Sequence, residues 1–397
     1  MKTGVRKALL VLPLALIVAA CGGGDGGGTS MDTGTVHVSM TDAPSCGFDH
    51  VFVTVNKVRV HASATASDTD AGWTDITLTT PKRVDLLTLT NGVLTDLGQA
   101  PLAAGQYQQV RLVLADNQGG STVNSVVPTP TPANPNPTEQ PLITPSGSQS
   151  GFKMVQQFTV QAGTLVDLVI DFNACKSVVQ RGNGTFSLKP VVKAIPMVVS
   201  GSIAGNVPAL QAGSQVFAEQ NGQVVSGTVA DANGQFVLSP LIQSSTNGNY
   251  DVVIVDNRTP NGHATGIIRA VPVTAGATTT VSTSGTPITL PVSAVNTASG
   301  TATASAQASL RGLQTISSVS YEITSANANA DTGAYSLALP AAAPLVGTFA
   351  TPLPIPLTAV PSVAGIYSIE ATSASGTVKS TPVNVSAGSQ TNVNFNF

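Results

Sequence analysis

Residues 105–114 read GQYQQVRLVL, and this stretch decides the fold class. Gly105 can adopt the positive φ of a tight turn, and Tyr107 places a large ring two residues later. In the run that follows, apolar residues alternate with polar ones, as in a half-buried β-strand. The alternating apolar positions are Val110, Leu112 and Leu114. The stretch therefore predicts a turn that leads into a strand of an all-β protein.

The same Gly-x-Tyr pattern recurs at residues 248–250 and 365–367, and each copy opens a β-rich run. Each is followed, farther along the chain, by an Ala-Gly turn. The three turns stand at residues 162–163, 275–276 and 387–388. A pattern repeated in this way is typical of repeated modules. We therefore predict an all-β fold of three consecutive β-sandwich modules, of the transthyretin or immunoglobulin type.

Breaks in the strand pattern mark the module boundaries. We predict modules at residues 34–197, 198–293 and 294–397. The first module contains a Pro-rich insertion at residues 119–151. Because the insertion lacks aromatic residues, we expect it to be disordered, with a functional loop as the alternative.

The first residues resemble the signal peptide of a bacterial lipoprotein. Residues 1–20 combine a cationic start with an apolar core that is too short for an ordinary membrane-spanning helix. The tetrapeptide Val18-Ala19-Ala20-Cys21 resembles a lipobox, which implies that Cys21 becomes the lipidated first residue of the mature chain. The alternative is a plain secretory signal with a cysteine at this position by chance.

Residues 21–33 follow as the lipidated cysteine and a flexible, Gly-rich tether. Several acyl chains on Cys21 would anchor the chain durably to a membrane. Gly22 stands where such lipoproteins tend to carry Asp when they are retained at the inner membrane. The resemblance therefore implies the outer membrane of a Gram-negative cell, on either its periplasmic or its surface face.

Residues 34–195 resemble a domain of bacterial lipoproteins, the domain of unknown function 4382. The resemblance rests on Thr41–Pro44, Phe48–Val55, Val84–Leu87, Gly105–Leu112, Ser150–Lys153, Asp171–Phe172 and Leu188–Pro190. It implies an all-β sandwich in an exported protein and no established activity. Residues 200–290 resemble the carboxypeptidase regulatory-like (transthyretin-type) sandwich, and residues 295–397 look like a diverged copy. This resemblance does not imply peptidase activity.

Charge and motif content argue against several functional classes. Charged residues make up only 9% of the 397 residues and the net charge is −3, so no basic stripe can neutralise nucleic-acid phosphates. The sequence contains no zinc-hydrolase motif, serine-hydrolase elbow, phosphate loop or dinucleotide fingerprint. We therefore expect a protein that is not an enzyme, has no cofactor or metal, and does not bind nucleic acid.

The cysteines predict one disulfide. If Cys21 carries the lipid, Cys46 and Cys175 remain as a pair. Export to an oxidising compartment favours a disulfide between them, and two free buried thiols are the alternative.

A few other residues could form a site. His37, His50 and Asp49 could meet at one end of a sandwich and bind a metal, although structural or surface histidines are commoner. Trp73 is interpreted as a core residue, with a sugar-stacking platform as the alternative. The run Asp68–Gly72 begins like a calcium loop but lacks the later ligands, so we interpret it as a hairpin turn.

Two functions remain. The first is a binding or adhesion module for a glycan or a protein, attached to the membrane through Cys21. The second is a structural spacer in the cell envelope without a dedicated ligand, which the low charge and the missing site motifs favour.

Overall fold

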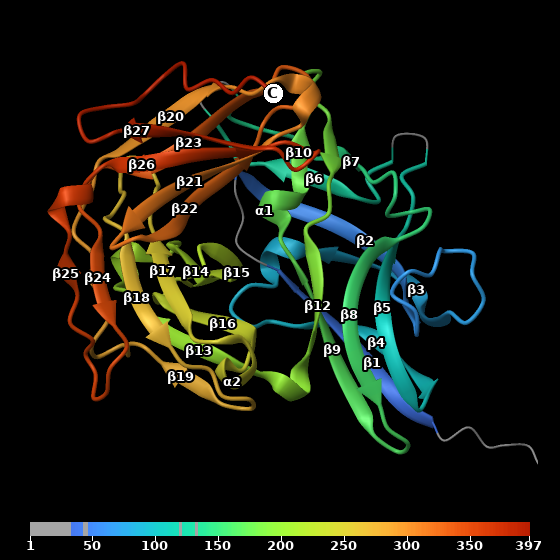
Figure 1. Ribbon diagram of the computed structural model, residues 1–397. Helices are drawn as coiled ribbons and strands as arrows, with labels where there is room; N and C mark the ends of the chain where they lie inside the picture. Colours follow the sequence, from blue (N-terminus) through green and yellow to red (C-terminus); the bar gives the residue numbers. More distant parts are fainter. Residues whose placement is uncertain (1–32, 43–46, 119–120, 132–133) are drawn as a thin grey trace, which may run out of the picture. The chain divides into compact units, whose positions relative to one another are not determined.

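The computed structural model describes residues 33–397 except 43–46, 119–120 and 132–133 (Figure 1). Its regular structure is almost entirely β, which confirms the predicted fold class. The predicted signal peptide, the lipidation site Cys21, most of the tether and Cys46 lie outside the described residues.

One strand order occurs three times along the chain. In each copy, one sheet has the first strand between an antiparallel fourth strand and a parallel last strand. The other sheet has the order third, second, fifth, sixth. These pairings make each copy a two-sheet sandwich.

The first copy consists of β1 (Thr33–Asp42), β2 (Phe48–His61), β3 (Thr74–Asp85), β4 (Thr95–Ala103), β5 (Gly105–Leu114), β8 (Phe152–Val160) and β9 (Leu165–Phe172). An extra strand, β12 (Val192–Pro196), pairs with β9. The second consists of β13 (Ser200–Asn206), β14 (Gln215–Gln220), β15 (Gln223–Val229), β16 (Gln235–Ile242), β17 (Tyr250–Val255), β18 (Gly266–Val271) and β19 (Thr278–Thr280).

The third copy consists of β20 (Val295–Thr301), β21 (Ser309–Ile316), β22 (Val319–Asn327), β23 (Ala334–Pro340), β26 (Ile366–Thr372) and β27 (Val378–Asn384). Its last strand is irregular: parallel bridges join β20 to Gln390 and Phe395 near the C-terminus. In every copy, the segment that pairs in parallel with the first strand begins just after the Ala-Gly turn.

The three Gly-x-Tyr tyrosines share one role. Each is buried, and each donates its hydroxyl to the carbonyl of the last residue of the fourth strand. The oxygen–oxygen distances are 3.1 Å from Tyr107 to Ala103, 2.7 Å from Tyr250 to Ile242 and 2.6 Å from Tyr367 to Pro340. Each ring thus packs in the core while its hydroxyl keeps a hydrogen-bond partner. That hydrogen bond connects the two sheets of the sandwich at one end.

The second and third copies share a core across β17. The side chains of Val252 and Ile254 pack into the second copy's own apolar cluster. Those of Val253 and Val255, on the opposite face of the strand, pack into the cluster of the third copy. A strand covered on both faces is expected to be apolar throughout, and all four residues are fully buried.

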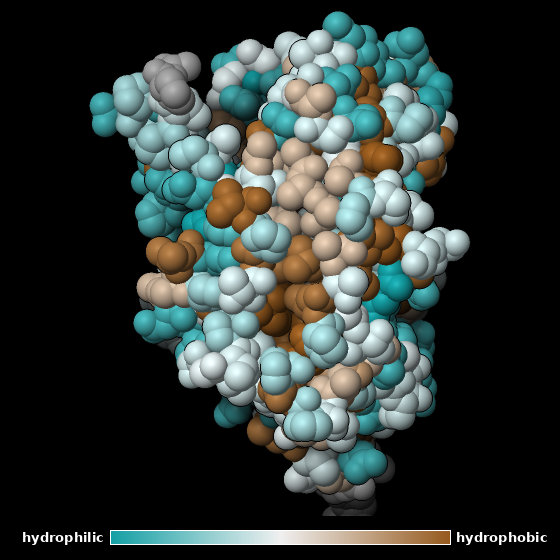
Figure 2. Space-filling model, turned by 90° about the vertical axis from the view of Figure 1, so that its left-hand side faces the viewer, coloured by the Kyte–Doolittle hydropathy of each residue, from teal (hydrophilic) through white to brown (hydrophobic). Residues whose placement is uncertain are grey.

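The third copy also extends the second copy's sheet. Between β23 and β26 the chain forms β24 (Leu345–Thr348) and β25 (Thr358–Ala359), and β24 pairs in parallel with β18. Residues 332–369 contain no charged side chain. Figure 2 shows the apolar surface that gathers on the face bearing β24 and β25.

The Pro-rich insertion contradicts the prediction of disorder in its described part. Its strands β6 (Ser125–Pro128) and β7 (Gln140–Ile143) pair with each other, and β6 pairs with β2. β7 in turn pairs with β11 (Phe186–Leu188), and β11 with β10 (Val178–Gln180). The insertion therefore widens one sheet of the first sandwich.

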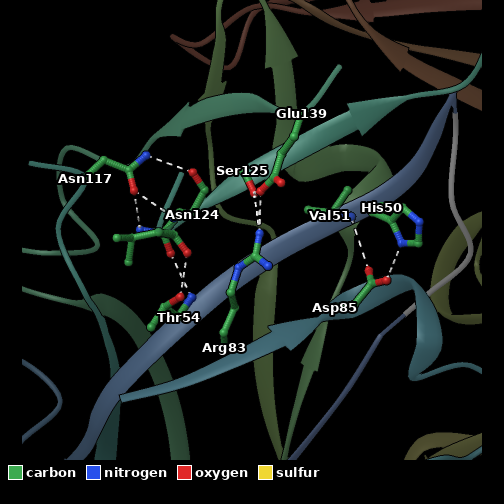
Figure 3. A network of polar contacts seen from close by, with 10 residues as sticks. His50, Val51, Thr54, Arg83, Asp85, Asn117, Asn124, Ser125 and Glu139 are labelled. Atoms are coloured by element: carbon green, nitrogen blue, oxygen red, sulfur yellow. Dashed lines mark hydrogen bonds and ion pairs between the residues drawn. The ribbon is translucent and has the colours of Figure 1, made fainter. Parts of the chain in front are cut away.

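A polar network holds the insertion on the sandwich (Figure 3). The buried Asn124 accepts a hydrogen bond from the Thr54 amide at 2.8 Å and donates one to the Ala115 carbonyl at 2.7 Å. Arg83 on β3 contacts both Ser125 on β6 and Glu139 beside β7. The insertion is thus attached to the sandwich by polar side chains, in place of the aromatic residues that pack an ordinary core.

Candidate functional site

A cleft of about 580 Å³ lies where the three sandwiches meet, and we call it the junction cleft. The first sandwich contributes Lys176, the second Phe217, Asp256 and Arg258, and the third Glu322. Charged groups therefore gather here in a chain that is otherwise poor in charge.

Lys176 reaches the cleft from the short helix α1 (Ala174–Ser177). A carboxylate and a side-chain amide cap the start of this helix. Asp42 accepts a hydrogen bond from the Ala174 amide at 3.0 Å, and Asn173 accepts one from the Lys176 amide at 2.9 Å. The Lys176 ammonium then lies 2.6 Å from Glu322 on β22.

Cys175 of the same helix is disulfide-bonded. Its predicted partner, Cys46, lies outside the described residues, so the pairing stays a prediction. Gly47 next to it lines the junction cleft.

Glu322 is the centre of a chain of ion pairs and hydrogen bonds that links all three sandwiches. Its second oxygen lies 3.3 Å from Arg311 on β21, which also pairs with Glu370 on β26 at 2.6 Å. Arg311 donates a further hydrogen bond of 3.0 Å to the Gly222 carbonyl in the second sandwich. The nearly complete burial of Glu322 is thus compensated by two cations.

A second buried carboxyl lies against the first. Glu219 on β14 accepts a hydrogen bond of 3.2 Å from the Glu322 amide, and its other oxygen has no partner within the described chain. Burial, together with the nearby Glu322 carboxylate, raises the pKa of Glu219 to about 8. Glu219 is therefore a neutral acid at pH 7.

The opposite wall carries an Asp-Arg-His cluster just after β17. The fully buried Asp256 carboxylate accepts two hydrogen bonds from Arg258, at 2.6 and 2.8 Å, and lies 2.8 Å from the His263 ring. A Cβ on Gly213 would stand 2.7 Å from Arg258 Nη1, so glycine is needed for the guanidinium to lie there. About 45% of the Arg258 side chain is exposed, which leaves donors facing the cleft.

This arrangement can hold a polar ligand. Its described acids are paired with cations or lie against one another, which leaves the exposed guanidinium of Arg258 as a donor for a polar ligand. Within the described residues, no three His, Cys, Asp or Glu side chains are grouped to hold a metal ion.

The residues weighed as a possible metal site, His37, His50 and Asp49, each have a different partner. His37 lies 2.7 Å from Asp167 and 3.0 Å from Asp96, whereas His50 lies 2.6 Å from Asp85. Asp49 accepts a hydrogen bond from the Thr129 hydroxyl instead. Both histidines act as structural partners of carboxylates on neighbouring strands.

The interpretation of Trp73 as a core residue is wrong. Its ring is only partly buried and lies beneath the guanidinium groups of Arg59 and Arg111, at 4.8 and 5.1 Å from the ring centroid. The nearby run that begins like a calcium loop forms turns, in which Asp70 accepts from the Ser67 amide and hydroxyl. These contacts support the hairpin interpretation of that run.

Sequence reasoning missed every charged residue of the junction cleft. Glu219 and Glu322 each stand in a strand beside apolar residues. An acidic residue at such a position is the one sequence feature that could have indicated a buried carboxyl. Both lie next to a β-bulge, which turns consecutive side chains inward.

Comparison with known proteins identifies one part of the chain. Residues 33–190 match the family model described as a domain of unknown function (DUF4382), which confirms that resemblance. The match covers the first sandwich with its insertion. No curated protein matches the chain.

Two solved structures are weakly similar. A minor pilin from Streptococcus agalactiae has 12% identity and a TM-score of 0.17, over 64% of this chain and 95% of the pilin. The tip fimbrial protein Mfa3 from Porphyromonas gingivalis, truncated at its C-terminus, has 12% identity and a TM-score of 0.16, over 48% and 83%. Both scores are too low to inform fold or function. Within the described residues, no helix has the length and apolar character to cross a bilayer.

Proposed function

We propose that the protein is a lipid-anchored, non-enzymatic protein of the cell envelope that binds a glycan or a protein ligand. The lipobox-like Val18-Ala19-Ala20-Cys21 and the glycines after it support the anchor. Three sandwiches on a flexible tether would hold a binding surface away from the membrane.

The junction cleft is the observation that carries the binding role. It is large enough for a small ligand or for a side chain of a larger one, and its walls come from all three sandwiches. Arg258 on one wall and Lys176 on the other keep cationic donors within reach of a polar ligand, each held in place by a buried carboxylate.

The anchor is tested by labelling cells with an alkyne-bearing palmitate analogue and separating inner and outer membranes. We expect the wild-type chain to be labelled and to sediment with the outer membrane, and Cys21→Ser to be unlabelled and released. A labelled Cys21→Ser chain would contradict the proposal. Protease treatment of intact cells then shows which face of the membrane the sandwiches occupy.

Binding is tested on arrays of envelope glycans and purified envelope proteins, with the mature chain in detergent. A saturable ligand should bind Arg258→Ala at least tenfold more weakly, because the cleft loses its exposed guanidinium. Arg181→Ala, which alters a cation outside the junction cleft, is the matched control. Equal affinity of all three chains would remove the junction cleft from the proposal.

A structural spacer is the second candidate. It is favoured by the core that the second and third sandwiches share across β17, since this packing resists bending between them. Absence of any saturable ligand on the arrays, together with an envelope defect in a deletion strain that Arg258→Ala restores fully, would make the spacer the better account.

A further inference from the structure

A second cleft, of about 480 Å³, lies on the insertion, and we call it the insertion cleft. It is bounded by described residues between β6 and β7, by the start of β2 and by the β10–β11 hairpin. Gly47 and Thr129 line both this cleft and the junction cleft, so the two are neighbours.

Among the described residues that line the insertion cleft, no side chain is charged. Its hydroxyl and amide groups include Thr131, Asn134, Asn136, Thr138, Gln140 and Gln180. An amide offers two donors and an acceptor, and a hydroxyl offers both, so these groups suit a ligand that also both donates and accepts. Such a pattern matches the hydroxyls of a sugar.

Two charged side chains beside the lining residues in the sequence are already paired. Asp49 accepts from the Thr129 hydroxyl at 2.9 Å, and Glu139 is paired with Arg83. Arg181, which follows Gln180, lines a different cleft. Asp49 is thus hydrogen-bonded to a lining residue, and the charge of Glu139 is balanced by Arg83.

An apolar surface completes the cleft. Phe48 from β2 packs edge-on against Phe186 from β11, with ring centroids 5.7 Å apart. Pro128 and Pro137 add two further apolar faces to the lining. The C–H face of a sugar ring needs such a surface once its hydroxyls are hydrogen-bonded.

The backbone around the cleft is held before any ligand arrives. Thr131 and Asn134 exchange two backbone hydrogen bonds of 3.0 Å, and the Thr129 amide donates to Gly47 at 3.0 Å. The Gln180 carbonyl accepts from Ala330 of the third sandwich at 3.0 Å. Within the described chain, the side-chain amides of Asn136 and Gln180 make no hydrogen bond and remain available.

We propose that the insertion cleft binds a neutral carbohydrate, which rests on the proposed binding function and narrows it to one ligand class and one site. Unpaired amides, hydroxyls, an aromatic pair and the lack of charge among the described lining residues distinguish it from the junction cleft.

The test titrates the mature chain in detergent with neutral oligosaccharides (maltohexaose, mannohexaose and N-acetylchitohexaose) and with charged polygalacturonate and hyaluronate. We expect saturable binding of at least one neutral oligosaccharide and none of the charged ones. Asn136→Ala and Gln180→Ala should each weaken it about tenfold, since each removes a hydrogen bond to the ligand. Gln157→Ala, an exposed glutamine on β8, is the control and should bind as wild type does.

Each outcome either supports or contradicts the proposal that the insertion cleft binds a carbohydrate. No binding of any neutral oligosaccharide, or equal binding by Asn136→Ala, Gln180→Ala and wild type, overturns the insertion cleft as a carbohydrate site. If a charged glycan or a protein binds instead, with sensitivity to Arg258→Ala, the proposed function stands and this inference fails. If neither class binds, both fail.

Discussion

Gly234 and Gly333 occupy the same turn in the second and third sandwiches, just before the fourth strand. Each has a φ of +70° to +79°, which disfavours any residue with a Cβ. The Gly234 carbonyl accepts from the Val207 amide at 2.9 Å, and the Gly333 carbonyl from Ala302 at 2.8 Å. In both sandwiches the turn glycine is therefore hydrogen-bonded to the residue that follows the first strand.

Replacing Gly333 with alanine should destabilise the protein strongly. A Cβ there would lie 1.7 Å from the Ala302 carbonyl oxygen, so the backbone must shift. We expect a loss of about 3 to 4 kcal/mol in the free energy of unfolding, from the clash and the unfavourable φ together.

The matched control is Gly276→Ala, at the same φ of +70° but with nothing within 4 Å of its Cβ. It should cost only about 1 to 2 kcal/mol. Urea denaturation of the two variants measures both losses in the free energy of unfolding. Equal losses would show that the contact between Gly333 and Ala302 does not add to the cost of the substitution.

Glu219 should make stability depend on pH. Its folded pKa is raised to about 8 from an ordinary value of 4.5, chiefly by burial. Between these values the folded chain holds a proton that the unfolded chain releases, so raising the pH favours unfolding. The melting temperature should therefore fall from pH 5 to pH 8.5 through this group.

The Glu219→Gln variant isolates the contribution, because its amide stays neutral. Calorimetry should give a flatter pH dependence for it than for wild type, and a higher Tm than wild type at pH 8.5. A variant with an unchanged pH profile would mean that Glu219 ionises freely in the fold.

At the scale of elements, the insertion depends on one buried amide. Asn124 bridges β2 and the segment before β6, and its side chain is completely buried. Asn124→Ala leaves the Thr54 amide without its acceptor, which should cost about 2 to 3 kcal/mol. Residues 119–151 should then be cut faster by a protease.

The Asn136→Ala variant is the control for that experiment, since Asn136 is exposed on the same insertion. It should leave both the Tm and the cleavage rate unchanged. Equal cleavage of the two variants would mean that β6 and β7 do not depend on Asn124.

The disulfide predicted between Cys46 and Cys175 would join the chain before β2 to α1. Digestion of the unreduced mature protein should yield one linked peptide pair containing both cysteines. Labelling of both thiols in the denatured, unreduced chain would contradict the pairing.

Local pattern was enough to predict strands and turns but not their partners. The Gly-x-Tyr turns follow from residues two positions apart, and the structure gives all three tyrosines the same bond. The order of the insertion was missed because Asn124 meets Thr54 70 residues away. The charge cluster around Glu322 was missed for the same reason, since its neighbour Glu219 lies 103 residues away along the chain.

For the whole molecule, the shared core predicts that the second and third sandwiches unfold together. Leu238 packs only in the second sandwich's own cluster. Leu238→Ala should cost about 2 to 5 kcal/mol and lower hydrogen-exchange protection in both sandwiches equally.

The exchange rates of β14 and β17 are to be compared with those of β21 and β26 in the same sample. Loss of protection confined to β14 and β17 would show that the two sandwiches open independently. The same measurement indicates whether the spacer role is mechanically plausible, because a spacer must not hinge at β17.

The pairing of β24 with β18 has a consequence for how the chain is made. Synthesis runs from the N-terminus, so the hydrogen-bonding edge at Gly266–Arg269 emerges well before its partner at residues 345–348. Until then the growing chain presents an open apolar strand edge, which is a template for pairing with another chain. A chain that stops within that interval should therefore self-associate more readily than the 397-residue chain.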